Sequence, residues 1–403
     1  MVTTFFPPHN FGGDGMWVYR LTNSLARQGH RLSVVYNPHA FKLMGGAISG
    51  QSFPLHANVE TFPLGPPRLG LAGTLLDHQL GQPFAHRPEL ERFFAGNEFD
   101  VVHFHNISLL GGPRILELGR GIKFCTLNDH WFVCAMHILW RFDREACQKR
   151  TCLACTLAGR RPPQLWRYTG TLDRALEQVD MFIAPSLSAV QTHRSNGFSR
   201  PIRALPYFLP ATEADSPVED SREDPPRRPY FLFVGRLEKM KGVQDLIEVF
   251  RTYRSAELVI AGIGAYENTL RQLAAGLEHV RFTGLQSDRQ LRNWYRGALA
   301  TVVPSIGYET FGWPTLESFA QRTPVIVRAI GPLPEIAAGG GLVFSTQAEL
   351  EAALSSLQGS PELRERLGEQ GFRNYQSRYT EAVHIDRYHE LVAEIRAQRE
   401  AGS

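Results

Sequence analysis

The chain is predicted to fold as two α/β domains, each a parallel sheet with helices on both faces. Short apolar strands alternate with amphipathic helices along most of its 403 residues, a pattern typical of parallel sheets that are covered on both sides. A chain of this length is too long for one ordinary hydrophobic core and suits two domains. A segment rich in proline and acidic residues divides the alternation into two halves.

The first half is predicted to be a Rossmann-like domain over residues 1–205. It opens with a strand at Val2–Phe6 that has almost no lead-in, so a start site trimmed too short is one interpretation. A helix with Val18, Leu21 and Leu25 at helical spacing follows, and Gly29 ends it as a left-handed cap. The further strands of this half are expected at Leu32–Tyr36, Val101–Phe104, Phe124–Leu127 and Met181–Ala184.

From Lys42 to Pro88 the alternation of apolar strands and amphipathic helices is lost, and the segment contains Gly, Pro and isolated apolar residues instead. That is long for an idle loop in a compact domain. Two interpretations stay open, namely a mobile excursion that contacts the acceptor or a membrane, and a poorly structured insertion.

A linker is predicted at residues 206–229, because its many prolines and acids cannot bury enough apolar area to order it. Its acids include Asp215, Glu219, Asp220, Glu223 and Asp224. Alternation restarts over 230–381, the second Rossmann-like domain, with a helix that carries Val243, Leu246, Ile247 and Phe250. Its strands are expected at Tyr230–Val234, Leu258–Ala261, Val280–Phe282, Thr301–Val303 and Val325–Val327. A terminal helix over about 382–403 is expected to pack back on the first domain.

Charge and hydropathy exclude several classes of protein. The 43 Lys and Arg against 40 Asp and Glu give a net charge of +3, far from the basic footprint of a dedicated nucleic-acid binder. No apolar run is long enough to span a bilayer, and the N-terminus lacks the basic-then-apolar pattern of a secretory signal. We therefore expect a cytoplasmic protein, with peripheral contact to the inner face of the membrane as an open possibility.

Two carboxylates flank a glycine turn that opens a helix in the second half. Glu309 ends the loop after strand Thr301–Val303, and Glu317 lies near the first turn of a helix that Pro314 starts. Gly312 between them lets backbone N–H groups approach a ligand closely. Carboxylates can accept hydrogen bonds from sugar and ribose hydroxyls, and backbone amides can donate to phosphate, so this pattern predicts a sugar-nucleotide site. The alternative is the start of a helix whose acidic side chains lie in water.

The strand that opens the second half runs into Gly235, Arg236 and Lys241 just before a helix. Cations are unfavourable at the start of a helix, so their presence favours an anion held between Arg236, Lys241 and the helix end. The alternative is a basic turn whose side chains lie in water.

Together these residues resemble the retaining GT-B glycosyltransferases of family four, over almost the whole chain. The resemblance implies two Rossmann-like domains facing a cleft, with the donor nucleotide held mainly by the second. It implies that Arg236 and Lys241 grip the diphosphate, that Glu317 binds the ribose, and that Glu309 binds the donor sugar. The resemblance also implies that the backbone at Phe311 and Gly312 contacts the donor sugar and that Gly235 belongs to the loop that binds the phosphates. The pair Gly12 and Gly13 matches the glycine pair in the first loop of the family.

The chain departs from the family at one catalytic position. Members carry a histidine just past a first-domain strand, near the transferred sugar, whereas this chain has Asn128 there and His130 two residues later. Three outcomes stay open: Asn128 makes the hydrogen bond to the sugar or acceptor, His130 turns into the place of the usual histidine, or catalysis is lost. A loop histidine with no catalytic role is the alternative for His130.

Four cysteines crowd one stretch of the first half, at Cys134, Cys147, Cys152 and Cys155. Disulfides are disfavoured in a cytosolic chain, and Cys152 and Cys155 have the spacing of a zinc knuckle. A structural zinc site, buried free thiols, and a redox or iron-sulfur role are the three interpretations. Arginines around this stretch can meet an anionic acceptor such as a lipid diphosphate, or form a solvated face.

The resulting expectation is a retaining transferase that moves a sugar from a nucleotide diphosphate sugar to a hydroxyl acceptor. The donor is expected to be a UDP-sugar, with GDP-mannose second, in the biosynthesis of polysaccharide, glycolipid or secondary metabolites. No metal is expected in catalysis, because Arg236, Lys241 and the helix amides supply positive charge. The alternatives are a nucleotide-sugar epimerase on the same fold and an inactive protein that binds a sugar nucleotide.

Overall fold

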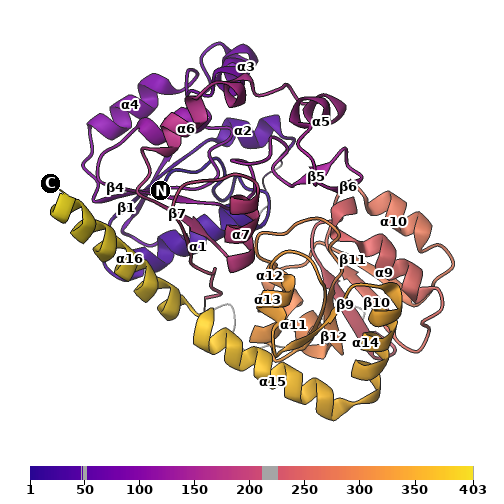
Figure 1. Cartoon of the computed structure of the whole chain (residues 1–403). Helices are drawn as coiled ribbons and strands as arrows, with labels where there is room; N and C mark the ends of the chain where they lie inside the picture. The colour runs from indigo at the N-terminus through magenta and orange to yellow at the C-terminus, as the bar shows by residue number, and fades with distance from the viewer. Residues whose placement is uncertain (47, 49–51, 211–225, 403) are drawn as a thin grey trace.

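The computed structural model describes residues 1–46, 48, 52–210 and 226–402, and it contains two parallel sheets with helices packed around them (Figure 1). The first sheet has the strand order β3-β4-β7-β8, next to a pair β1-β2, and every pairing in it is parallel. Its strands are β1 (Leu32–Tyr36), β2 (Val59–Pro63), β3 (Val101–Phe104), β4 (Ile122–Thr126), β7 (Met181–Ala184) and β8 (Ile202–Ala204).

The N-terminal residues join the two parts of this first sheet. Val2 forms bridges to Val35 on β1 and to Phe104 on β3. Its N–H donates to the carbonyl of His103 over 2.9 Å, while the N–H of Thr3 donates to the carbonyl of Val35 over 3.0 Å. The expected first strand is therefore present as a short segment in the middle of the sheet.

The second sheet has six parallel strands in the order β11-β10-β9-β12-β13-β14. These strands are β9 (Tyr230–Val234), β10 (Glu257–Ala261), β11 (Val280–Gly284), β12 (Ala300–Val303), β13 (Val325–Arg328) and β14 (Gly341–Phe344). The order reverses direction between β9 and β12, and an open α/β sheet binds ligands at such a switch point. The α/β fold with parallel sheets that the sequence predicts is confirmed.

Helices cover both sheets (Figure 1). In the first half they are α1 (Gly13–Arg27), α2 (Pro38–Leu43), α3 (Gly70–Leu80), α4 (Arg87–Ala95), η1 (Pro113–Glu117), α5 (Cys152–Ala158), η2 (Leu165–Tyr168), α6 (Thr171–Leu176) and α7 (Leu187–Ser195). In the second they are η3 (Lys239–Lys241), α9 (Val243–Phe250), α10 (Glu267–Leu273), α11 (Asp288–Gly297), α12 (Trp313–Ala320), α13 (Leu333–Ala337), α14 (Gln347–Gly359), α15 (Pro361–Arg378) and α16 (Glu381–Gly402). Among the described residues, no helix is both long enough and apolar enough to cross a bilayer.

The described part of segment 42–88 holds β2, α3 and the start of α4. Of the two interpretations, the poorly structured insertion was wrong, for a physical reason. Within the described part of the chain β2 pairs only with β1, and none of its residues is fully buried, so its sequence needs no continuous apolar run. Helix α3 exposes its leucines, which breaks the periodicity that marks a helix packed on a core.

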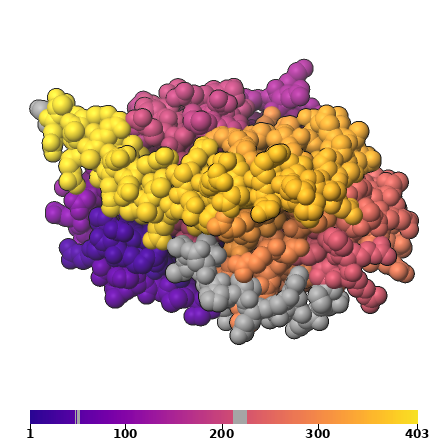
Figure 2. Space-filling view, turned by 90° about the horizontal axis from the view of Figure 1, so that it is seen from below, coloured from indigo at the N-terminus to yellow at the C-terminus, as the bar shows by residue number. Residues whose placement is uncertain are grey.

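The C-terminal helices α15 and α16 run along both halves, as the yellow chain in Figure 2 shows. Helix α16 packs against α1 and β4 of the first half, and Tyr388 on it is buried beside His103 and Phe124. The predicted linker 206–229 lies in part outside the described residues, and with it all of its acids.

The packing of α15 against the second half predicts a position that tolerates only glycine. A Cβ on Gly368 would lie 2.0 Å from the backbone oxygen of Arg322. We expect Gly368→Ala to lower the free energy of unfolding by about 2–3 kcal/mol, as overpacking does, measured by urea denaturation. Gly359, at the end of α14, is the control because a Cβ there meets nothing within 4 Å. An equal loss in Gly359→Ala would contradict this explanation.

Candidate functional site

The two halves meet through loops at the carboxyl ends of their strands. Trp17 and Tyr207 of the first half lie against Trp313, which opens α12 of the second, with the Tyr207 and Trp313 rings stacked 5.2 Å apart. A Cβ on Gly13 would lie 3.1 Å from Trp313 Nε1, so the glycine loop of α1 comes close to this contact. The predicted first loop and the predicted second-half site therefore face each other.

Lys241 and Glu309 form an ion pair beside this contact. Lys241 Nζ lies 2.6 Å from Glu309 Oε1, and the Ser305 hydroxyl donates to the same oxygen over 2.8 Å. Burial acts to raise the pKa of Glu309, but Lys241 and Ser305 outweigh it and the pKa is lowered. Gly242 has φ of 74°, and a Cβ there would lie 2.0 Å from the oxygen of Pro304. That close approach holds the Lys241 turn against the loop after β12.

Arg236 extends from the loop after β9, which begins at Gly235. Its side chain is 60% exposed and its Nη1 lies 3.0 Å from Glu238 Oε1. Lys241 is the main cause of the lowered pKa of Glu309, and the charge of Arg236 adds to it, while the same charge partly opposes the rise that burial causes in the pKa of Asp14. Arg236 therefore lies within electrostatic range of acidic groups from both halves, and its role in binding the diphosphate stays a prediction.

Glu317 lies apart from the Lys241 pair. Gly312, with φ of 107°, precedes α12, and buried Phe311 precedes Gly312. Glu317 on α12 accepts a hydrogen bond from the Tyr295 hydroxyl over 2.6 Å, and it lines a small pocket with Arg20 of α1. The two predicted carboxylates thus lie on either side of the Gly312 turn, Glu309 before α12 and Glu317 within it, and contact different partners.

Asn128 lies nearer the opposite half than His130 does. The Thr310 hydroxyl donates to the backbone oxygen of Asn128 over 2.9 Å, and the Asn128 side chain is buried beside His105. His130 is only 2% exposed, with its ring 5.1 Å from that of His193. Burial and His193 lower the pKa of His130 to about 3, which keeps the ring neutral at physiological pH. The geometry favours Asn128 over His130 at the interface.

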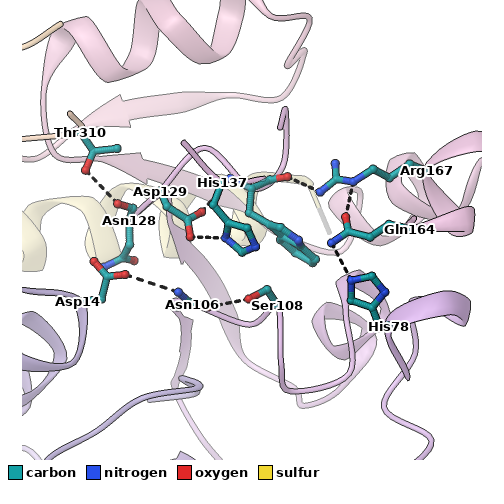
Figure 3. Close-up of polar contacts among 11 residues, drawn as sticks. Asp14, His78, Asn106, Ser108, Asn128, Asp129, His137, Gln164, Arg167 and Thr310 are labelled. Atoms are coloured by element: carbon teal, nitrogen blue, oxygen red, sulfur yellow. Dashed lines mark hydrogen bonds and ion pairs between the residues drawn. The ribbon is translucent and has the colours of Figure 1, made fainter. Parts of the chain in front are cut away.

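Four further polar residues, Asp14, Asn106, Asp129 and His137, were missed by the sequence analysis. Figure 3 shows Asp14 of α1 bonded to Asn106, and Asp129 bonded to His137. Asn106 donates to Asp14 over 3.5 Å, and His137 Nδ1 lies 2.8 Å from Asp129 Oδ2. Asp14 directly follows the predicted glycine pair and Asp129 directly follows Asn128, so adjacency was the signal that could have found them.

The two aspartates have opposite pKa shifts. Burial, and then the charge of Asp129, raise the pKa of Asp14 to about 6. Burial also acts to raise the pKa of Asp129, but His137 and the backbone N–H of Trp131 outweigh it and the pKa is lowered. Opposite shifts in a neighbouring pair are typical of sites that handle protons.

The four predicted cysteine ligands all line one small pocket near the hairpin of β5 (Trp140–Arg141) and β6 (Glu145–Ala146). All are free thiols, and the fifth, Cys125, is buried elsewhere. Burial raises the pKa of Cys134, while the backbone N–H of Leu139 lowers it. Within the described part of the chain, no three or more His, Cys, Asp or Glu side chains are arranged to hold a metal ion. The structural zinc site stays a prediction.

Comparison with known families matches both halves. The family described as Glycosyl transferases group 1 matches residues 217–374, and the one described as Glycosyltransferase Family 4 matches residues 11–210. A glycogen synthase of Mycobacterium tuberculosis is 36% identical over 401 residues, which cover 91% of this chain and 87% of that protein. Alignments with several other curated glycosyltransferases span less than two thirds of those proteins' own length.

Solved structures show the same fold. Sucrose-phosphate synthase from Thermosynechococcus elongatus superposes with a TM-score of 0.73 and 19% identity, covering 100% of this chain and 98% of that one. HepE from Anabaena, solved in complex with UDP-glucose, gives a TM-score of 0.65 and 14% identity, covering 98% and 99% of the two chains. At these identities the likeness is one of fold.

The raised pKa of Asp14 predicts a pH-dependent cost to stability. An unfolded aspartate ionises near pH 4, whereas folded Asp14 stays protonated up to about pH 6, so the folded state loses stability as the pH rises between these values. We expect Asp14→Asn to be more stable than wild type by about 1–2 kcal/mol above pH 6, after a discount for partial exposure. The gain should vanish near pH 4.

Urea denaturation at pH 4, 5, 6 and 7 measures this difference. The exposed Asp386 on α16 is the control position, and Asp386→Asn should show no such pH-dependent gain. A constant difference between Asp14→Asn and wild type at all four pH values would show that Asp14 titrates normally.

Proposed function

Because the chain belongs to the group 1 glycosyltransferases, we propose that it moves a sugar from a nucleotide diphosphate sugar to a hydroxyl acceptor. The observation that carries this proposal is the Lys241–Glu309 ion pair at the junction of the two halves. It places a fixed cation and a carboxylate side by side near the switch point of the second sheet, where open α/β sheets bind ligands.

In this proposal Lys241 and Arg236 bind the diphosphate. Glu309 holds the ammonium of Lys241 in place before the donor arrives, so little reorganisation is needed when negative charge develops on the leaving phosphate. Exposed Arg236 can close over the phosphates from the other side, where its planar fork suits their oxygens. Backbone amides at the start of α12 add donors near Gly312.

The two carboxylates then bind hydroxyl groups of the donor. Glu309 and the backbone at Phe311 and Gly312 would hold the sugar, while Glu317, oriented by Tyr295, would accept hydrogen bonds from the ribose. A UDP-sugar is the first choice of donor, since the similarly folded HepE was solved with UDP-glucose. GDP-mannose is second.

The proposed reaction retains the anomeric configuration without a covalent intermediate. The acceptor hydroxyl attacks from the face that the nucleotide leaves, its oxygen bonds to the anomeric carbon, and its proton passes to the departing phosphate oxygen. Asn128 and ionised Asp14 lie on the first-half side and would orient the acceptor hydroxyl by accepting its hydrogen bond. Stabilisation of the phosphate by Lys241 is the main contribution of the enzyme.

We further propose that the acceptor belongs to polysaccharide or glycogen-type biosynthesis and is carried on a lipid at the inner face of the membrane. Support comes from five basic residues in segment 149–168 of the first half, namely Lys149, Arg150, Arg160, Arg161 and Arg167. The protein would then work in the cytoplasm with peripheral contact to the bilayer.

Removal of the fixed cation tests the proposed mechanism. We expect Lys241→Ala to lower turnover on the order of a hundred- to a thousandfold, as the loss of one oxyanion donor does, measured as kcat with saturating donor. Lys239 in the same turn is the control, since its ammonium bonds the carbonyl of Asp143 over 3.1 Å, and Lys239→Ala should stay within a few-fold of wild type. A Lys241→Ala variant within a few-fold of wild type would remove Lys241 from the mechanism.

Product analysis with a panel of nucleotide sugars tests the function itself. With a UDP-sugar, with EDTA present and an acceptor supplied, we expect transfer to continue, because Lys241, Arg236 and the α12 amides supply positive charge without a metal. Release of an isomer from donor alone would indicate an epimerase. Donor binding without hydrolysis or transfer would indicate an inactive binding protein, and strict dependence on manganese would contradict the metal-free mechanism.

A further inference from the structure

Helix α3 exposes its apolar side chains and buries a glycine and a charged residue. Its apolar residues Leu71, Leu75 and Leu80 are 70%, 48% and 47% exposed, whereas the residues it buries are Gly73 and Asp77. A helix on a water-soluble surface normally buries its apolar stripe and exposes its charges. The reversed pattern indicates that the leucines of α3 have a partner outside the fold.

The orientation of α3 is fixed by its buried side. A Cβ on Gly73 would lie 1.8 Å from the backbone oxygen of Arg68, so only glycine fits at that contact. Four residues later, Asp77 Oδ1 accepts the backbone N–H of Ala85 over 2.8 Å. The helix therefore cannot rotate to bury its leucines without breaking this hydrogen bond and the close glycine contact.

The neighbouring segment 149–168 adds exposed apolar side chains and positive charge. It contains five basic residues and no Asp or Glu, and its exposed apolar residues are Leu153, Leu157, Leu165 and Tyr168. Trp166 Nε1 donates to the carbonyl of His78 on α3 over 3.0 Å. Helices α3 and α5 lie at the same outer edge of the first half (Figure 1). We call α3 together with segment 149–168 the leucine face.

We propose that the leucine face docks on an anionic lipid bilayer. Exposed leucines on a short helix can enter the boundary between head groups and acyl chains, while nearby cations attract anionic head groups. Arg160 and Arg161 follow α5 after its C-cap Gly159 and are both exposed, and the charge of Arg161 contributes to the lowered pKa of His78 on α3, after burial. An apolar surface flanked by cations with no acids among them complements a negatively charged membrane.

The leucine face is connected to the candidate site through hydrogen bonds that Figure 3 shows. His78 lies 3.4 Å from Gln164, which accepts from Arg167, and Arg167 donates to the backbone oxygen of Trp131. The N–H of Trp131 donates to Asp129 over 2.8 Å. Docking would therefore hold the acceptor side of the site near the lipid surface. Only this link to a lipid-carried acceptor rests on the proposed function; the docking itself does not.

Co-sedimentation with vesicles tests the proposal. We expect the full chain to bind vesicles that contain phosphatidylglycerol, and to bind vesicles of phosphatidylcholine alone at least tenfold more weakly. Binding to the anionic vesicles should also weaken as salt is raised, since salt screens the cations. Equal binding to both kinds of vesicle, or to neither, would overturn the proposal.

Two pairs of substitutions locate the docking surface. Leu71→Ser with Leu75→Ser should weaken binding at least tenfold. Arg160→Gln with Arg161→Gln should weaken it about fivefold per arginine, which corresponds to ~1 kcal/mol per cation near an anionic surface. Leu285, exposed by 70% in the second half, is the matched control, and Leu285→Ser should bind as wild type does.

The outcomes separate docking from catalysis and from self-association. Lys241→Ala should bind vesicles as wild type does, so failure of the glycosyltransferase proposal would leave docking intact. Wild-type vesicle binding by both pairs of variants would overturn the docking surface. A dimer seen by size-exclusion chromatography would also overturn the docking surface if the leucine substitutions dissociate it and the wild type binds no vesicles. A second copy of the chain would then cover the leucine face.

Discussion

Thr310 makes the contact on which the arrangement of the site depends. Its hydroxyl donates to the backbone oxygen of Asn128, and its own carbonyl accepts from the Ser186 hydroxyl of the first half. Because Thr310 directly follows Glu309 in the chain, this contact fixes the ion-paired carboxylate against the loop that carries Asn128. Loops from two separate sheets thereby become one site, although neither half holds all of the groups that the proposed reaction needs.

The pKa values of the acidic side chains in the site differ according to their surroundings. Glu309 and Asp129 keep lowered pKa values because Lys241 and His137 lie within 3 Å of them. Asp14 has a hydrogen bond from neutral Asn106, and its burial leaves it with a raised pKa. Among the described residues, negative charge is thus balanced at Glu309 and Asp129 and left without a cationic partner at Asp14. Uncompensated charge of this kind costs stability, a cost that functional sites commonly carry.

The loop from Asn128 to His137 belongs to both the site and the surface beside α3. Its backbone oxygens at Trp131 and Phe132 accept from Arg167, and Arg167 lies over the Trp166 ring with 4.5 Å between the guanidinium carbon and the ring centroid. A transferase that works on a lipid-carried acceptor must bring that acceptor to the donor. The loop from Asn128 to His137 contacts Thr310 at one end and Arg167 further along, so the proposed docking surface and the proposed donor site share one structural element.

The sequence by itself determined the alternation of strands and helices, the glycine loop before α1, and the candidate residues Lys241 and Glu309, because each depends on local spacing and backbone geometry. Only the tertiary structure decided that Asp14 is bonded to Asn106, that Glu317 bonds Tyr295 rather than sharing a partner with Glu309, and that α3 exposes its leucines. Each of those features depends on which distant segments meet, and hence on burial, and no pattern within one segment encodes that.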